Sequence, residues 1–153
     1  MFFSYPVCPT ENSTSTTWFK EVAGKCYYIM NQGCPDGNGC TLQEAQTICG
    51  SVFGSDTSGI VFEPTTKAIN DAVLKTAYDT VGGSRPFWIG VNYDDLTYYS
   101  NSNPVSIDLW SDYKDYYDYD DTFECVGAYS SSKDWWSFDC DNSKMSTICE
   151  MTS

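Results

Sequence analysis

The stretch Phe87-Trp88-Ile89-Gly90-Val91 has the pattern of a buried β-strand. Its bulky apolar residues follow one another without a polar break, and Pro86 restricts the backbone just before them. A glycine inside a strand often marks a place where another backbone comes close, so Gly90 predicts such an approach. Two helix-like segments precede this stretch, and a long irregular tract follows it. We therefore expect a central strand that carries a cysteine-stapled loop.

Two amphipathic helices are predicted before the central strand. Thr41-Leu42-Gln43-Glu44 is a capping box, in which the Thr and Glu side chains bind each other's backbone amides, so a helix should begin there. A second helix should begin at about Thr66 and end at Gly82-Gly83. Apolar residues recur at helical spacing in both: Leu42, Ala45, Ile48 and Cys49, then Ile69, Ala72, Val73 and Ala77. We interpret both apolar faces as core packing, which places Cys49 in the core.

Short β-prone segments surround these helices. Residues 24–30 have the composition of a strand, and Cys8 is well placed to tie the N-terminal segment back to it. Residues 9–17 are rich in Ser and Thr and predict a surface loop. Near the C-terminus, residues 124–129, 135–138 and 145–150 give three strand signals separated by turns. An antiparallel sheet is expected there, preceded by a strand and turn over residues 98–104.

The cysteine content points to an oxidising compartment. Eight cysteines in 153 residues indicate a disulfide framework, which is typical of proteins outside the cell. The turn-forming residues between Cys34 and Cys40 predict a small local loop closed by that pair. Because the chain has no His and no Cys-x-x-Cys pair, a structural zinc site is disfavoured. The first residues are too short for a signal peptide's apolar core, and Asn12-Ser13-Thr14 is a glycosylation acceptor, so we expect a mature secreted chain.

Charge narrows the range of partners. The formal net charge is -13, and only eight Lys and Arg are spread through the chain. Nucleic acid is disfavoured as a partner because phosphate binding needs a basic face, and an anionic membrane surface is disfavoured for the same reason. No stretch is long enough to insert across a bilayer. We expect one acidic, extracellular domain over residues 1–153.

In its ordered features the sequence resembles the C-type lectin-like domain. The residues that carry the resemblance are Cys8, Trp18, Gly24-Lys25-Cys26-Tyr27, Glu44-Ala45, Cys49, Phe87-Trp88-Ile89-Gly90, Tyr99-Ser100, Pro104-Val105, Trp110, Cys125-Val126, Cys140 and Ile148-Cys149-Glu150. The resemblance implies an α+β fold with two helices flanking antiparallel sheets, a long irregular loop and disulfide staples. It also implies the pairs Cys8–Cys26, Cys49–Cys149 and Cys125–Cys140, with Cys34–Cys40 as an additional local bridge. A bridge that closes roughly a hundred residues removes on the order of 4–5 kcal/mol of unfolded-state entropy.

The calcium and sugar site of the family's sugar-binding members is not matched. Those members use a Glu-Pro-Asn or Gln-Pro-Asp triplet, a Glu two residues before the next cysteine, and a Trp-Asn-Asp triplet. The corresponding positions here are Lys114-Asp115-Tyr116, Phe123 and Trp135-Trp136-Ser137, with Glu124 one residue late. Calcium needs about six to eight oxygen ligands, so the loss of several donors predicts that the usual site is absent.

The long loop, from Ile107 to Phe123, is the predicted binding region. It is dense in acidic and tyrosine residues: Asp112, Tyr113, Asp115, Tyr116, Tyr117, Asp118, Tyr119, Asp120 and Asp121. One interpretation is a relocated calcium site at Asp115, Asp118 and Glu124, and the other is a solvated acidic loop. The candidate ligand contacts are Asp115, Tyr116, Tyr117, Tyr119 and Trp136, because aromatic rings stack on sugars and on protein side chains. For Trp135 and Trp136 we expect at least one to be buried in the core.

These features favour a binding module over an enzyme. With no His and every cysteine expected in a disulfide, only loop carboxylates remain for acid–base work. The leading hypothesis is a secreted recognition module that binds a glycan or a protein surface through its long loop, with no cofactor or with weakly bound calcium. The alternative is an ice- or mineral-binding member of the same fold, whose acidic loop would be the adsorbing face.

Overall fold

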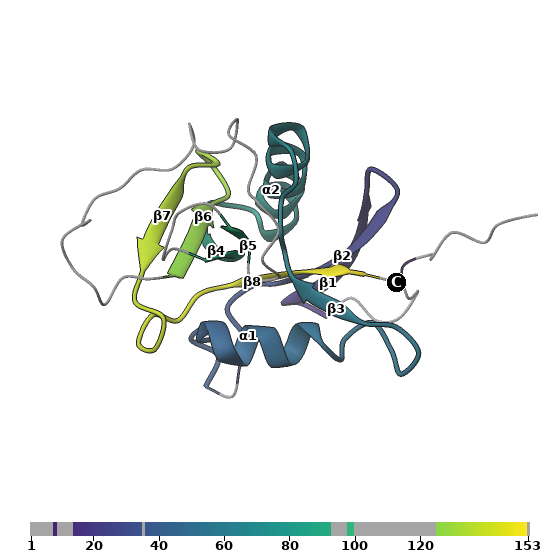
Figure 1. Ribbon diagram of the computed structural model, residues 1–153, viewed down its shortest axis with the longest axis horizontal. Coiled ribbons are helices and arrows are strands. Elements are labelled where there is room, and N and C mark those ends of the chain that lie inside the picture. The colour runs from purple at the N-terminus through teal and green to yellow at the C-terminus, as the bar shows by residue number, and fades with distance from the viewer. Residues whose placement is uncertain (1–7, 9–13, 35, 93–97, 100–124, 153) are drawn as a thin grey trace, which may run out of the picture.

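Two four-stranded antiparallel sheets form the framework of the protein (Figure 1). The computed structural model describes residues 8, 14–34, 36–92, 98–99 and 125–152. The first sheet has the strand order β1-β2-β8-β3. Its strands are β1 (Thr17–Val22), β2 (Lys25–Met30), β3 (Gly59–Val61) and β8 (Thr147–Met151). The first and last parts of the described chain therefore share one sheet.

The second sheet contains the predicted central strand. Its order is β5-β4-β6-β7, with β4 (Pro86–Asn92), β5 (Tyr98–Tyr99), β6 (Cys125–Tyr129) and β7 (Trp135–Phe138). β4 also reaches beyond its own sheet: the Trp88 amide donates to the Ser146 carbonyl (3.2 Å) and the Gly90 amide to the Phe62 carbonyl (2.8 Å). A Cβ at Gly90 would lie 3.0 Å from the Val61 carbonyl oxygen, so the predicted close approach is confirmed.

Two helices lie on opposite sides of the layer that contains β8 (Figure 1). α1 (Leu42–Cys49) begins with the predicted capping box, in which the Glu44 amide donates to the Thr41 hydroxyl (3.2 Å) and the Thr41 amide to the Glu44 carboxylate (2.9 Å). α2 (Lys67–Val81) has Thr66 as its N-cap and ends at Gly82, whose φ of 83° is left-handed. Among the described residues, no helix has the length and apolar content needed to cross a membrane.

The sequence did not predict β1 or β3. Both are edge strands, β1 pairing with β2 and β3 with β8. β1 contains the exposed residues Lys20 and Glu21, and Thr17, predicted to be loop, is its first residue. β3 has three residues, which is too short for an alternating pattern. Edge strands bury less apolar side chain, so their composition resembles that of a loop.

The disulfides hold α1 to the first sheet and close loops at both sheets. All eight cysteines pair as the resemblance implied: Cys8–Cys26, Cys34–Cys40, Cys49–Cys149 and Cys125–Cys140. Cys49–Cys149 spans 100 positions and links α1 to β8 inside the core. The buried residues form two clusters, one packed around α2 and one around α1 and the disulfides. The α+β, disulfide-stapled architecture is therefore confirmed.

Candidate functional site

The structure describes one of the predicted contact residues, Trp136. The other predicted ligand and metal residues lie outside the described residues: Asp115, Tyr116, Tyr117, Asp118, Tyr119 and Glu124. β6 begins at Cys125, directly after this segment, and pairs with β7. The hairpin formed by β6 and β7 is thus the described part of the candidate site.

Trp135 and Trp136 point to opposite faces of the second sheet because neighbouring residues alternate along a strand. Trp135 is fully buried, and its indole N–H donates to the Asn70 side-chain oxygen on α2 (3.0 Å). Trp136 is half-buried, with its ring perpendicular to that of Tyr129 at a centroid distance of 6.5 Å. The expectation that at least one of these indoles lies in the core is confirmed for Trp135.

Four aromatic rings lie in sequence on the face that carries Trp136. Tyr129 is 6.5 Å from Trp136 and 6.4 Å from Phe138, which is in turn 6.2 Å from Trp88. We call Trp136, Tyr129, Phe138 and Trp88 the aromatic row. Trp88 is buried and donates to the Cys40 carbonyl (2.8 Å), whereas the other three rings are half-buried. The row is therefore anchored at one end and partly accessible to solvent along the rest.

Gly127 makes room for these rings. It lies opposite Trp136 in the β6–β7 register. A Cβ at this position would come within 2.6 Å of the Met145 methyl carbon and 2.8 Å of the Phe138 ring. Both contacts are shorter than van der Waals separation, so any side chain here would displace the row or Met145.

The turn after β7 is held by hydrogen bonds and an ion pair. The Asn142 side-chain amide donates to the Asp139 carboxylate (2.9 Å), as does the Asp141 backbone amide (2.9 Å). These bonds, with that of Asn142 first, lower the pKa of Asp139 below its ordinary value. Lys144 pairs with Asp36 (2.8 Å) across the chain and lowers the pKa of Asp36. The turn that follows Phe138 is thus tied to the Cys34–Cys40 loop.

The described part of the site does not fit calcium. Where the resemblance would place the Asn and Asp of a Trp-Asn-Asp triplet, β7 carries Trp136 and Ser137. An indole offers calcium no oxygen, and the Trp136 ring packs on Tyr129. In the described ranges no three His, Cys, Asp or Glu side chains gather in a way that could hold a metal ion.

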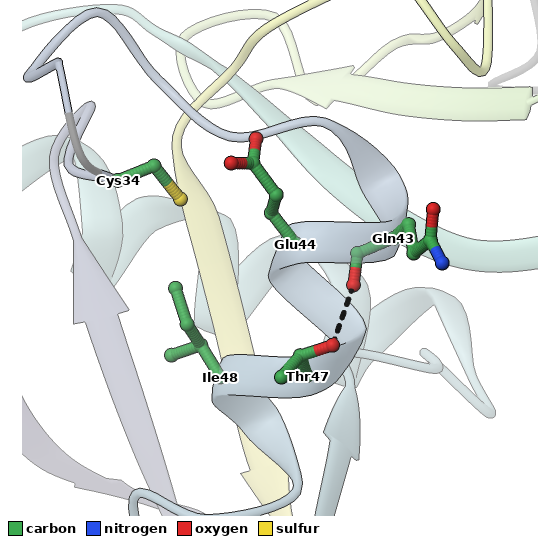
Figure 2. Close-up of a pocket in the computed structure, with 5 residues that line it drawn as sticks. All are labelled: Cys34, Gln43, Glu44, Thr47 and Ile48. Atoms are coloured by element: carbon green, nitrogen blue, oxygen red, sulfur yellow. Dashed lines mark hydrogen bonds between the residues drawn. The ribbon is translucent and has the colours of Figure 1, made fainter.

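Figure 2 shows a different hollow, on the outer side of α1 beside the Cys34–Cys40 loop. It has a volume of about 370 Å³ and is lined by Cys34, Gln43, Glu44, Thr47 and Ile48. Glu44 completes the helix cap, the Thr47 hydroxyl donates to the Gln43 carbonyl (3.1 Å), and Cys34 is in a disulfide. These polar groups serve local structure, so we assign no ligand to this hollow.

A buried ion pair was also missed by the sequence analysis. Glu150 on β8 is 5% exposed, accepts from the Lys25 ammonium and also accepts from the Glu63 amide. Burial, and secondarily the charge of Glu150, raises the pKa of the nearby Tyr27 hydroxyl. The bonds of Glu150 to Lys25 and to the Glu63 amide join β2, β8 and the segment after β3, which indicates a structural role.

The sequence did not predict that Tyr129 and Phe138 lie on the same face of the sheet as Trp136. Phe138 is two residues after Trp136 and shares its face by alternation, but Tyr129 joins them only through the β6–β7 register. The available signal was the period of two in residues 135–138.

The comparisons with known proteins concern the fold. No protein-family model matches the sequence, and no curated protein sequence matches it. Among solved structures, the C-type lectin CEL-I from Cucumaria echinata is 14% identical, with a TM-score of 0.67 over 95% of this chain and 97% of that one. Human lithostathine is 20% identical, with a TM-score of 0.65 over 98% and 94%. The carbohydrate-recognition domain of the mouse scavenger receptor C-type lectin is 17% identical, with a TM-score of 0.60 over 86% and 93%. The chain therefore has the C-type lectin-like fold.

Proposed function

We propose that residues 1–153 form a single secreted recognition domain that binds a glycan or protein ligand through the long loop and the aromatic row. The observation that carries the proposal is the row itself. Three half-buried rings on the β6–β7 hairpin lie next in the chain to the Tyr-rich segment that ends at Phe123. Aromatic rings supply large contact area at a low entropic cost and stack on sugar faces and protein side chains alike.

The proposed mode of binding does not use the usual calcium-dependent sugar site. Its contacts are Asp115, Tyr116, Tyr117 and Tyr119 from the loop and Trp136 from β7. Four disulfides and the neighbouring lectin-type folds support an extracellular setting for such a module. The ring of Trp136 is oriented by Tyr129 before any ligand arrives, which reduces the entropy lost on binding.

A glycan array screened with calcium and again with a chelator tests this proposal. We expect saturable binding to one ligand class, unchanged by chelation. The variants Trp136→Ala and Tyr116→Ala/Tyr117→Ala should each weaken binding by about 2 kcal/mol or more, as anchors at interfaces do. Tyr28→Ala is the matched control, because Tyr28 is a half-buried aromatic residue on β2 of the other sheet and belongs to neither proposed contact surface. Normal binding by both site variants would contradict the proposed contact surface.

The second candidate is adsorption to ice or to a mineral surface. The observation that favours it is the acidic loop in a chain of net charge -13. A mineral binder should take up many calcium ions weakly, whereas a recognition module should bind one ligand saturably. Calorimetric titration separates them, and we expect calcium affinity no tighter than about 10⁻⁴ to 10⁻³ M. A single micromolar calcium site that disappears on changing Asp115 and Asp118 to Asn would contradict this expectation.

A further inference from the structure

A second hollow lies between α2 and the turn that joins β6 to β7. Its volume is about 320 Å³, and it is lined by Lys75, Tyr78, Asp79, Ser130, Ser131 and Lys133. α2 packs on the sheet face that carries Trp135, so this hollow and the aromatic row lie on opposite faces. It is also at the Pro86–Tyr129 end of the β4–β6 ladder, while the segment before Cys125 leaves from the Asn92–Cys125 end. The hollow is therefore separate from the aromatic row.

The described lining of this hollow holds two lysines and one carboxylate: Lys75 pairs with Asp79, and Lys133 is the cation that Asp79 does not pair. Four described lysines pair with acidic residues: Lys25, Lys67, Lys75 and Lys144. In the part of the chain that the structure describes, Lys20, Arg85 and Lys133 make no such pair. Arg85 is next to Ser84, whose hydroxyl is 2.7 Å from that of Ser131 in the lining. Two of the three cations thus lie at one end of an acidic protein.

Lys133 has a backbone conformation that lysine rarely adopts. Its φ is 64°, in the left-handed region that favours Gly and Asn. The Lys133 amide donates to the Tyr129 carbonyl (2.8 Å), and the Tyr129 amide donates to the Asp134 carbonyl (3.1 Å), so the turn is held in this form. A strained non-glycine residue at the edge of a hollow is a reason to look for a function of its side chain.

The remaining lining groups suit a sugar ring. Tyr78 is 41% exposed and is the most exposed large hydrophobic side chain among the described residues. A tyrosine face of this kind stacks on the apolar face of a sugar, and hydroxyls such as that of Ser131 exchange hydrogen bonds with sugar hydroxyls. Lys75 uses part of its ammonium on Asp79 (2.8 Å), which raises the pKa of Lys75, and two of its three N–H donors are available to a ligand.

We propose that this hollow binds a saccharide unit that carries a sulfate or carboxylate group. Lys133 and Lys75 hold the anionic group, and Tyr78 lies against the ring. A volume of about 320 Å³ is at the lower end of the range for small-molecule sites, which matches one such unit. Asp79 is the carboxylate in the described lining, and the Lys75 ammonium 2.8 Å away offsets its charge. Carboxylates farther than about 8 Å oppose an anion only weakly, because such charges are screened at physiological ionic strength. The described lining residues are distinct from those of the aromatic row, and this site goes beyond the proposed function.

Amide chemical-shift titrations of the ¹⁵N-labelled protein test this site with four probes: galactose 6-sulfate, galacturonic acid, neutral galactose and sodium sulfate. We expect one or both acidic sugars to shift the amides of Tyr78, Ser131 and Lys133 saturably. Neutral galactose and sodium sulfate should bind at least several times more weakly, because each lacks one half of the interaction. The two acidic probes separately show whether the hollow accepts sulfate, carboxylate or both.

Matched variants distinguish the loss of a binding charge from a loss of folded structure. Lys133→Asn removes the ammonium but keeps a residue that tolerates left-handed backbone, and it should weaken binding roughly three- to tenfold. Tyr78→Ala is a second variant at an exposed position and should also weaken binding. Lys20→Asn removes the same charge from β1, and Trp136→Ala removes a ring from the other face, so both should bind the acidic sugars normally.

Three outcomes would overturn the site. The first is that neither acidic sugar binds the wild type. The second is that neutral galactose or sodium sulfate binds as tightly as the acidic sugars. The third is that Lys133→Asn and Tyr78→Ala both bind the acidic sugars as the wild type does. Because the proposed recognition surface is tested with Trp136→Ala and the long-loop variants, its failure would leave these measurements unaffected.

Discussion

The two faces of the second sheet are built from the same three strands but differ in how they are used. The face toward α2 carries Phe87, Ile89, Val126, Ala128 and Trp135, all almost fully buried. The opposite face carries the aromatic row, of which only Trp88 is fully buried. Because side chains alternate along β7, one face can be committed to the core while the other presents rings to solvent. The neighbours Trp135 and Trp136 show this division most directly.

The polar atoms of the indoles mark the same difference. The N–H of Trp135 is bound by Asn70 of α2, and that of Trp88 by the Cys40 carbonyl. Each bond fixes a buried ring against a distant segment of the chain. The Trp136 ring packs edge-on against Tyr129 within the hairpin. Packing against α2 thus fixes the position of the sheet, and the rings of the aromatic row are held on the other face of the same strands.

The largest expected effect comes from truncating the ring on the α2 face. Trp135→Ala should lower the free energy of unfolding by about 3–5 kcal/mol, because it removes a fully buried indole and leaves a cavity against α2. Guanidinium unfolding with the disulfides intact measures this change. A loss no larger than that of Trp136→Ala would remove the distinction between the two faces.

A smaller loss is expected when only the partner of Trp135 is removed. Asn70→Ala should lower the free energy of unfolding by about 2 kcal/mol, since the buried indole N–H would have no acceptor. If Asn70→Ala were neutral by the same unfolding measurement, the hydrogen bond would not be what fixes Trp135.

Much of this framework could be predicted from the sequence. The capping box at Thr41, the glycine end of α2 and the apolar run of β4 are local signals, and each predicted its element correctly. The disulfide pairing followed from the resemblance. β1 and β3 were missed because edge strands with exposed polar residues have no strong period.

The candidate sites were less predictable because they depend on register and on contacts between distant segments. Trp136 was singled out by its type, but Tyr129 joins it only through β6–β7 pairing. The hollow beside α2 combines Tyr78 with Lys133, which are far apart in the chain and share no local pattern. The predicted loop residues remain predictions, since they lie outside the described residues.

The packing of the aromatic row can be tested at its glycine. Gly127→Ala should lower the free energy of unfolding by about 1–2 kcal/mol, because the new methyl group collides with Met145 and the Phe138 ring. Near-ultraviolet circular dichroism should change as well, since the rings must shift. Gly83→Ala is the control, as a Cβ there meets no other atom within 4 Å. An unchanged spectrum in Gly127→Ala would mean that the row adapts without cost.

Trp136→Ala should have the smallest effect among the ring substitutions. We expect a loss of about 1 kcal/mol or less, because the ring is half-buried. Thermal unfolding of Trp136→Ala and Trp135→Ala under the same conditions measures the difference between the two losses. A loss as large as that of Trp135→Ala would assign Trp136 to the core and would remove it from the proposed binding surface.

The smallest expected effect is a pH dependence of stability on the aromatic face. The turn that follows Phe138 on this face is held by the ion pair between Asp36 and Lys144. The hydrogen bond from Lys144 is the main cause of the lowered pKa of Asp36, so the folded state binds a proton at Asp36 less readily than the unfolded state does. This contribution is complete above the ordinary pKa of 3.8 and is lost as pH falls through the lower folded pKa. Asp36→Asn keeps the oxygen that accepts from the Asn38 amide and removes only the charge. Its melting temperature should therefore be slightly below that of the wild type at pH 6, and the difference should shrink as pH falls below 3.8. A constant difference between wild type and Asp36→Asn across this range would show that the ion pair does not stabilise the turn beside the row.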